Sequence, residues 1–455
     1  MKSFSLLASI FANIFTLILM GWNSCSTENE SKEIVTSFVV GRDNLKEKEY
    51  SGSQKVESNQ KSDESQKTDS KKIDSKPEGI VVIGGAGDVI FHGRVKSTAD
   101  YQMTSPSAPE DSRYEGWWHI FKQLEPVVKK TDIALVNLES PIARERKKAT
   151  GRPPVLNGPA SAVKAMREAG FSIFNIANNH AFDQMREGVQ ETCEAVKEAK
   201  GDYIGGGPDR ATAESPVVKE INGLKIAFLG WTLTLNKNFN EVKTDNKPWI
   251  AVYTPDGSIS KIKGIRSSVD VVVVSMHWGA EFSLQAGSRE KEIAKKLCSA
   301  GADIILGHGP HILHPVEIMD DPSGNGRKCV VAYSLGNLLS NQGLKYRYGW
   351  NPPNLIEAKN IPYTRDGIIL RVHVSKKEGK VVFNKVEATA IWTENNWLER
   401  YAKGVIPPDD IFIVPIVPYF DSERVKNDEK LKLLLMERLS VIKKMVGSTV
   451  TWSDL

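Results

Sequence analysis

The chain has 455 residues, of which 40% are hydrophobic and 25% are charged, and its formal net charge is +4. That length allows two or three ordinary domains with a sizeable buried core. The composition excludes a collagen-like, coiled-coil, disulfide-scaffold or fully disordered chain. A near-neutral charge indicates no nucleic-acid partner, and a single long apolar run excludes a polytopic membrane protein.

The first 25 residues are predicted to be an export signal. A basic residue precedes an apolar run at 4–22, and small polar residues follow it, as in secretory signals. The run approaches the roughly 18–20 residues that cross a bilayer. Cys25 follows a small residue, as in a lipoprotein processing site, although Trp22 and Asn23 depart from that pattern. Lipidation of Cys25, cleavage with secretion, and an uncleaved anchor are therefore alternatives. Each of them places the body outside the cytoplasm, in the cell envelope or beyond it.

Residues 26–78 are predicted to form a disordered linker. They are rich in Ser, Lys, Glu, Asp and Gln and offer little apolar surface to bury. Their charges nearly cancel, which favours a solvated spacer over a binding tail. The folded domain is expected at 79–375, and a C-terminal extension at 376–455 is expected to pack on it.

The body alternates between short apolar runs and helical patterns. The runs are bounded by turn-forming residues, which is typical of strands covered on both faces. They lie at 80–83, 133–136, 173–176, 226–229, 271–275, 304–306 and 330–333. Helical patterns at 160–169, 185–199 and 289–300 each end near a glycine, the usual helix stop. This alternation predicts an α/β domain, followed by a hairpin and a final amphipathic helix at about 429–446.

Polar side chains follow six of the predicted strands. The segments are Gly87-Asp88, Asn137-Leu138-Glu139, Asn178-Asn179-His180, His277-Trp278-Gly279, Gly307-His308-Gly309-Pro310-His311 and Ser334-Leu335-Gly336-Asn337. In open α/β sheets, functional groups gather just beyond the carboxyl ends of strands. Carboxylate and amide oxygens with imidazoles suit Zn²⁺, Mn²⁺ or Fe, and the lack of cysteine there argues against a structural zinc finger. The pattern therefore predicts a site for two divalent ions that share a carboxylate.

Each of these residues also has a structural alternative when it is taken alone. Asp88 could cap a helix or turn, Glu139 could lie in a surface turn, and His180 could be a hydrogen-bonded core histidine. The metal site is favoured because separate loops would otherwise have to carry these residue types independently. Two further sets are expected to be structural, namely the histidines His92, His119 and His373 and the buried cysteines Cys193, Cys298 and Cys329.

The ordered motifs resemble the CapA family of bacterial capsule and poly-γ-glutamate synthesis proteins, which is related in fold to calcineurin-like metallophosphatases. The resemblance spans about residues 79–374. It implies a four-layer α/β/β/α sandwich of metallophosphatase type, with the metal site at one edge of the sheets. Val89 and Ile90 follow Asp88 where metallophosphatases usually have Asp-x-His, and the second motif is Asn-x-Glu instead of Gly-Asp-x-x-Asp. These departures leave open whether the site is catalytic.

The resemblance also implies a role for individual residues. His180 corresponds to the catalytic histidine that protonates the leaving group, and Glu139 corresponds to the bridging carboxylate. The expected metal ligands are Asp88, Glu139, Asn179, His277, His308 and His311. The residues expected to line the pocket are Asn137, Trp278, His314 and Asn337.

The leading hypothesis is an exported, membrane-tethered CapA-like protein that serves the synthesis or attachment of an extracellular anionic polymer. Two divalent ions would activate water for attack on a phosphoester or an amide. The first alternative is a non-catalytic scaffold that holds the polymer or its precursor within a membrane synthesis complex. The second is a surface lipoprotein with a decayed site. Sequence spacing does not decide among the three, because it carries no distances.

Overall fold

The computed structural model describes residues 79–144, 155–240, 247–322, 324, 326–349 and 361–453. The expected signal, Cys25 and the linker lie outside these residues. Within them, no helix combines the length and the apolar character that crossing a bilayer would need. The described residues all belong to one compact unit, Asp74–Leu455.

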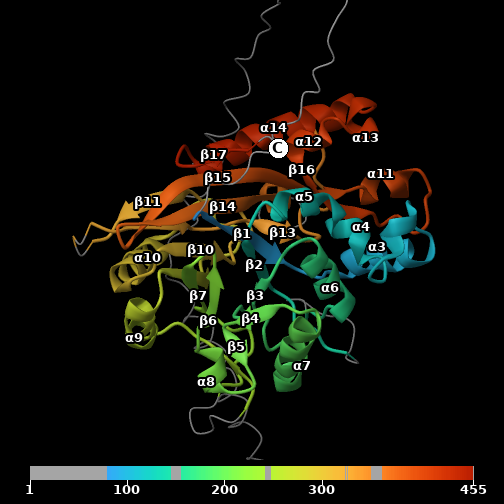
Figure 1. Ribbon diagram of the computed structural model, residues 1–455. Coiled ribbons are helices and arrows are strands. Elements are labelled where there is room, and N and C mark those ends of the chain that lie inside the picture. The colour runs from blue at the N-terminus through green and yellow to red at the C-terminus, as the bar shows by residue number, and fades with distance from the viewer. Residues whose placement is uncertain are drawn as a thin grey trace, which may run out of the picture. The chain divides into compact units, whose positions relative to one another are not determined.

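Nine strands of the described residues form a mixed sheet, called here the larger sheet (Figure 1). Its order is β16 (Ile411–Pro415), β15 (Lys380–Asn395), β14 (Asp366–Lys377), β1 (Val81–Val89), β2 (Ile133–Leu138), β3 (Ile173–Asn175) and β4 (Asp202–Ile204), with β13 (Asn337–Leu339) beside β1 and β17 (Thr451–Trp452) beside β15. Strands β1 to β4 run parallel, whereas β14, β15 and β16 pair antiparallel. The carboxyl ends of β1, β2 and β3 therefore meet at one edge.

Six further strands, within the same described ranges, form the smaller sheet. Its order is β11 (Val316–Asp320), β12 (Lys328–Ala332), β10 (Ile304–His308), β9 (Val271–His277), β7 (Leu224–Thr232) and β6 (Val217–Ile221). The four central strands run parallel, and the two edge strands are antiparallel. A separate short pair joins β5 (Gly206–Gly207) to β8 (Trp249–Ile250).

Alternate residues of the central strands face different hydrophobic clusters, as the two-residue period of a strand requires. In β2, Leu135 belongs to a cluster shared by both sheets and the last helix, α14 (Glu429–Val446), whereas Val136 belongs to a cluster shared with helices. Those helices are α3 (Gly93–Thr104), α4 (Trp117–Phe121), α5 (Glu125–Val128), α6 (Ala160–Glu168) and α7 (Met185–Glu198). A third cluster joins the smaller sheet to α9 (Pro255–Ile265) and α10 (Ser288–Ala300).

The predicted mixed α/β architecture is confirmed. All seven apolar runs fall on strands, and the three helical patterns fall on α6, α7 and α10. The predicted final helix occupies 429–446 as α14. The predicted hairpin is β14–β15, and β14 also pairs with β1, so the hairpin extends the larger sheet. The domain boundaries proposed from the sequence stay predictions. Short helices complete the C-terminal region, namely α11 (Trp397–Ala402), α12 (Ile416–Tyr419) and α13 (Glu423–Lys426).

A buried ion pair fastens α14 to the larger sheet. Arg438 on the helix is 2% exposed, and Asp366 at the start of β14 is fully buried. The Nε of Arg438 donates to Oδ1 of Asp366 over 3.1 Å, and its Nη2 donates to Oδ2. The guanidinium also lies 5.0 Å from the centroid of the Tyr363 ring. The helix is thus held by a specific buried ion pair in addition to its apolar contacts.

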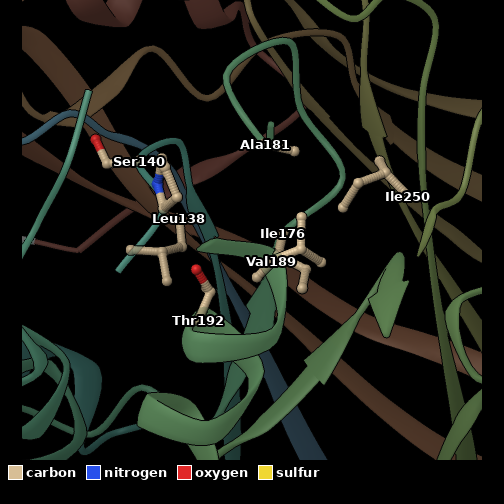
Figure 2. A pocket seen from close by; sticks show the side chains of 8 residues that line it. Leu138, Ser140, Ile176, Ala181, Val189, Thr192 and Ile250 are labelled. Atoms are coloured by element: carbon tan, nitrogen blue, oxygen red, sulfur yellow. The ribbon is translucent and has the colours of Figure 1, made fainter. Parts of the chain in front are cut away.

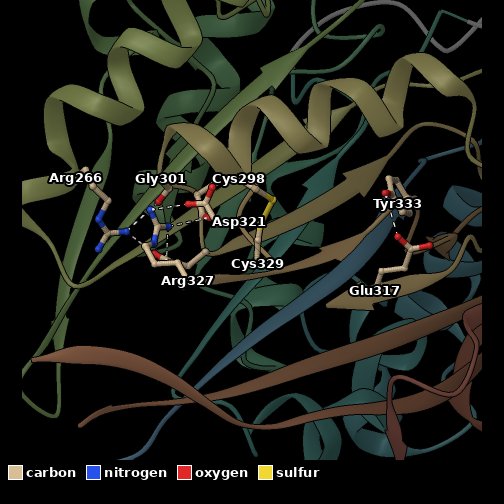
Figure 3. The surroundings of a disulfide bond; sticks show 10 residues. Arg266, Cys298, Gly301, Glu317, Asp321, Arg327, Cys329 and Tyr333 are labelled. Atoms are coloured by element: carbon tan, nitrogen blue, oxygen red, sulfur yellow. Dashed lines mark hydrogen bonds and ion pairs between the residues drawn. A yellow bond between two sulfur atoms is a disulfide. The ribbon is translucent and has the colours of Figure 1, made fainter. Parts of the chain in front are cut away.

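One disulfide corrects the prediction that the buried cysteines are separate apolar residues. Cys298 near the end of α10 is bonded to Cys329 in β12, with their Cα atoms 5.8 Å apart (Figure 3). The sequence did not reveal the pairing, because the 31 residues that separate the two cysteines do not show that α10 packs on β12. Cys193 is buried and free, as expected.

Removing this disulfide is expected to destabilise the fold. Closing a loop of 31 residues lowers the entropy of the unfolded chain and is worth about 2–4 kcal/mol. The double variant Cys298→Ala/Cys329→Ala should therefore lose that free energy of unfolding in urea titrations. A reducing agent should destabilise the wild type and a Cys193→Ala control alike, and should leave the double variant unchanged. If a reducing agent lowered the unfolding free energy of the double variant as much as that of the wild type, a bond other than Cys298–Cys329 would be responsible.

Candidate metal centre

The centre lies where the carboxyl ends of both sheets meet. Asp88 in β1 is the register partner of Asn137 in β2, and His277 in β9 is the register partner of His308 in β10. The Asp88 carboxylate joins the two sheets, because its Oδ1 accepts from Nδ2 of Asn137 over 2.8 Å and its Oδ2 accepts from the backbone N–H of Gly309 over 3.1 Å. All of these side chains are buried.

The backbone around Asp88 is packed too tightly for most side chains. A Cβ on Gly87 would lie 2.0 Å from the carbonyl oxygen of Gly336, so only glycine fits there. His311 has a φ of 60°, in the left-handed region that a histidine rarely adopts. Such strain persists only where the surroundings fix it, and it is frequent at functional sites.

His311 is held between two carboxylates. Its Nδ1 lies 3.0 Å from Oδ2 of Asp88 and 3.2 Å from Oδ1 of Asn337, and its Nε2 lies 3.8 Å from Oε1 of Glu139. One ligand atom from each of Asp88, Glu139 and His311 lies within 4.8 Å of the other two. His277 also directs Nε2 to Oε1 of Glu139, at 3.9 Å. His308 Nδ1 lies 3.6 Å from Oδ1 of Asp88.

Several ligand atoms of the centre have no hydrogen-bond partner within the described part of the chain. They are both carboxylate oxygens of Glu139, both ring nitrogens of His308, and Oδ1 of Asn179. Glu139 and His308 are fully buried. Polar atoms that are buried without a partner cost free energy and are uncommon in native proteins. A divalent cation would satisfy all three residues, so the residues present fit the metal that the sequence predicts.

Burial and neighbouring charges shift the pKa values of the residues in the centre in different directions. Burial would raise the pKa of Asp88, but the hydrogen bond and charge of His311 outweigh it and lower that pKa to about 2. Burial raises the pKa of Glu139 well above its usual value. Burial also lowers the pKa of His277 to about 3 and that of His308 to about 4. These two imidazoles are therefore neutral at pH 7, which is the form that binds a metal.

His311 behaves in the opposite way and leads to a prediction. Burial would lower its pKa, but the charge of Glu139 and the hydrogen bond to Asp88 raise that pKa to about 9. The ring is thus protonated at pH 7 in the metal-free protein, and a metal ion must displace that proton. We expect metal binding at pH 7 to release at least about one proton, and the affinity to rise as the pH approaches 9. Calorimetric titrations in two buffers of different ionisation enthalpy measure this release, and identical heats would contradict it.

His180 lies beside the centre and is oriented by a carboxylate. Its Nδ1 is 2.7 Å from Oδ2 of Asp183, and the same oxygen accepts from the backbone N–H of Leu156 over 2.7 Å. The Nδ2 of Asn236 lies 3.5 Å from the ring. His180 directly follows Asn179, whose buried Oδ1 is one of the ligand atoms without a partner, so the ring lies next to the centre. A carboxylate on Nδ1 stabilises an imidazolium whose Nε2 carries a transferable proton.

The residues predicted to line a pocket divide into two groups. Asn137 and Asn337 contact the ligands, since they bond Asp88 and His311 respectively. Trp278 instead lies in the third hydrophobic cluster, where its Nε1 donates to the carbonyl of Tyr333 over 2.9 Å, so its ring packs in the core. His314 donates from Nε2 to the carbonyl of Ser283 over 2.8 Å.

Sequence reasoning missed two supporting residues. Asp183 and Asn236 orient His180, and only Asp183 left a signal, the spacing His-x-x-Asp on one loop. His92 was expected to be structural. It accepts from the backbone N–H of Asn341 over 3.1 Å, which agrees with that expectation. Burial lowers the pKa of His92 to about 3, so its ring is neutral at pH 7.

A small apolar cavity lies behind the loops that carry Glu139 and His180 (Figure 2). Leu138 and Ala181, the chain neighbours of those two residues, line it together with Ile176. The polar atoms at its wall are already engaged, because the hydroxyl of Ser140 accepts from a backbone N–H. This cavity is therefore an apolar gap in the packing around Leu138 and Ala181.

Comparison with known families identifies the chain. Residues 82–342 match the family described as "Bacterial capsule synthesis protein PGA_cap", and that match covers more than half of the sequence. The chain belongs to this family. All of the proposed metal ligands lie inside the part that matches PGA_cap, and the resemblance predicted from the motifs is confirmed.

Two of the relatives are CapA proteins of Bacillus species. "Capsule biosynthesis protein CapA" of Bacillus anthracis is 34% identical over 239 residues, which cover 51% of this chain and 56% of that protein. "PGA biosynthesis protein CapA" of Bacillus subtilis (strain 168) is 31% identical over 259 residues, which cover 56% of this chain and 61% of that protein. The chain thus matches less than two thirds of the length of either relative. Among solved structures, the calcineurin-like phosphoesterase YfkN from Bacillus subtilis is similar with a TM-score of 0.36 and 12% identity, covering 80% of this chain and 99% of that one.

Proposed function

We propose that this PGA_cap chain is an exported, membrane-tethered protein that serves the synthesis or attachment of an extracellular anionic polymer through a metal-dependent, hydrolase-type site. The observation that carries the proposal is the convergence of Asp88, Glu139 and His311 within 4.8 Å, at a place where Glu139 and His308 are buried without hydrogen-bond partners. The names of the relatives, which refer to capsule and poly-γ-glutamate (PGA) synthesis, support the polymer class.

The proposal includes the finer points of architecture and location. The three hydrophobic clusters support a four-layer α/β/β/α sandwich of metallophosphatase type, because one cluster is shared by both sheets and the other two join a sheet to helices. The disulfide between Cys298 and Cys329 supports export, since such bonds persist mainly in oxidising compartments. The tether itself rests on the sequence pattern before residue 26.

Six residues would hold two divalent ions, with Mn²⁺, Zn²⁺ or Fe as the candidates that their donor atoms suit. They are Asp88, Glu139, Asn179, His277, His308 and His311. Glu139 is the proposed bridge, because His277 and His311 approach its Oε1 within 3.9 Å and 3.8 Å. When bound, such ions polarise an ester or amide and lower the pKa of water to about 7.

The chain's own contribution to the reaction would be proton transfer and orientation. His180 would carry a proton at Nε2 and give it to the leaving group, since a positioned histidine is the commonest general acid. Asp183 would hold the ring and stabilise its charged form through the 2.7 Å contact at Nδ1. Asn137 and Asn337 would fix Asp88 and His311 in place.

The test combines metal analysis with an activity assay. The purified full chain, loaded with Mn²⁺ or Zn²⁺, should hydrolyse a generic phosphodiester or an amide of the polymer. The variant His180→Gln should lower kcat by about 10²-fold and should leave the bound metal unchanged, because His180 is not a proposed ligand. The control His373→Gln, on β14, should keep full activity. Metal binding and polymer binding without turnover of any ester or amide would favour the scaffold alternative instead.

A further inference from the structure

A second cavity opens at the smaller sheet, apart from the metal centre. It has a volume of about 130 Å³, several times the space that one water molecule requires. Two indole rings, those of Trp231 and Trp249, form its apolar walls, and Arg210 and Lys261 bring positive charge to it. The guanidinium of Arg210 lies 5.4 Å from the centroid of the Trp249 ring. Cations beside aromatic faces in one concave site are typical of a binding site.

A carboxylate of the chain already lies between the two cations. Glu214 accepts from Nε of Arg210 over 2.8 Å at Oε1, and its Oε2 lies 3.6 Å from Nζ of Lys261. The side chains of Arg210 and Lys261 are 44% and 42% exposed, and that of Glu214 is 24% exposed. The three charges sum to one positive charge. The two cations are therefore placed to bind a carboxylate, as their contacts with Glu214 show. The remaining positive charge attracts a second carboxylate.

The end of β7 and the segment that follows it run between the cavity and the metal centre. Trp231 precedes Thr232, which is the register partner of His277 in the neighbouring strand. Neighbouring strands lie about 4.8 Å apart. The segment that leaves β7 also donates from the backbone N–H of Asn236 to the carbonyl of Asn179, and then reaches the cavity at Asn240. A chain-like ligand would have to pass around the end of β7 to occupy both the cavity and the metal centre, because Trp231 and Thr232 point to opposite faces of that strand.

We infer that this cavity is a subsite for one free carboxylate along an anionic polymer, held by Arg210 and Lys261 against the indole of Trp249. The inference rests on the proposed function, because it extends the same substrate away from the metal centre. The methylene groups of the polymer backbone next to that carboxylate would pack on the ring, and the carboxylate would replace Glu214 as the partner of the cations.

The test measures binding of a γ-linked glutamate decamer to the full metal-loaded chain at low ionic strength, where exposed charges are least screened. Arg210→Gln and Lys261→Gln should each weaken binding at least about five-fold, since each removes one cation from the carboxylate. Glu214→Gln should strengthen binding, since it removes the competing carboxylate. Lys263→Gln is the matched control. It changes the same charge on the same helix at an exposed position and should alter affinity less than two-fold.

Opposite effects of the Arg210 and Glu214 variants on decamer affinity would distinguish a specific subsite from general charge attraction. Thermal unfolding of each variant checks that it is folded. Equal affinity in Arg210→Gln, Lys261→Gln, Glu214→Gln and the wild type would overturn the subsite. If binding then still depended on Asp88 or His308, the proposed function would stand without it. Absence of decamer binding to the wild type would overturn both.

Discussion

A Glu139→Gln variant is expected to lose metal-dependent stabilisation while its metal-free form stays at least as stable as the wild type. The carboxylate of Glu139 is fully buried, neither of its oxygens has a hydrogen-bond partner within the described residues, and burial raises its pKa. Without metal, the charge is thus a cost to the fold. With metal, the same charge becomes a ligand, and it lies within 3.9 Å of both His277 and His311.

Thermal or urea unfolding with and without Mn²⁺ or Zn²⁺ measures both effects. Metal at 100 times its Kd should stabilise the wild type by about 2.7 kcal/mol, whereas the variant should show little or no gain and no hydrolysis. Glu220→Gln, the same change at an exposed position on β6, should behave as the wild type. A variant that keeps the full metal-induced gain would show that Glu139 is not a ligand.

Replacing Arg438 by Met is expected to cost about 3–5 kcal/mol of unfolding free energy. The change leaves the fully buried Asp366 without the guanidinium that now offsets its burial. Because α14 also contributes apolar side chains to the cluster shared by both sheets, the effect should reach the whole fold. The deficit should shrink as the pH falls, since Asp366 can then be protonated.

Two controls isolate the uncompensated charge. The double variant Arg438→Met/Asp366→Asn should recover much of the loss, because no ion remains buried. Lys432→Met, on the same helix, breaks an exposed pair with Glu429 and should cost less than about 1 kcal/mol. An Arg438→Met protein as stable as the wild type would show that water reaches Asp366.

The sequence predicted the elements well because their signals are local. Runs such as Val271–Ser275 are apolar and bounded by turn formers, and the helical patterns end near glycines. The position of polar residues at the strand ends was predictable for the same reason, since Asp88 and His277 lie at the ends of buried strands. The resemblance to the family motifs then indicated that these strand ends lie together.

The features that the sequence did not reveal depend on contacts between elements that are far apart in the chain. The Cys298–Cys329 bond requires knowledge that α10 packs on β12, and Asn236 reaches His180 only because a loop folds back from β7. Trp278 follows a ligand in sequence, yet its ring turns into the core. Neighbours in the chain point to opposite faces of a strand, so a motif alone does not show which of its members face the site.

Because residues of both sheets form the centre, it assembles only at a late stage of folding. Asp88 and His311 are 223 residues apart, and their contact forms only after both sheets have docked. An unfolded or partly folded chain therefore has no assembled binding site and cannot hold a metal ion there. The metal would be taken up late, at the place where the chain finishes folding, and the ions abundant in those surroundings would determine which one the protein uses.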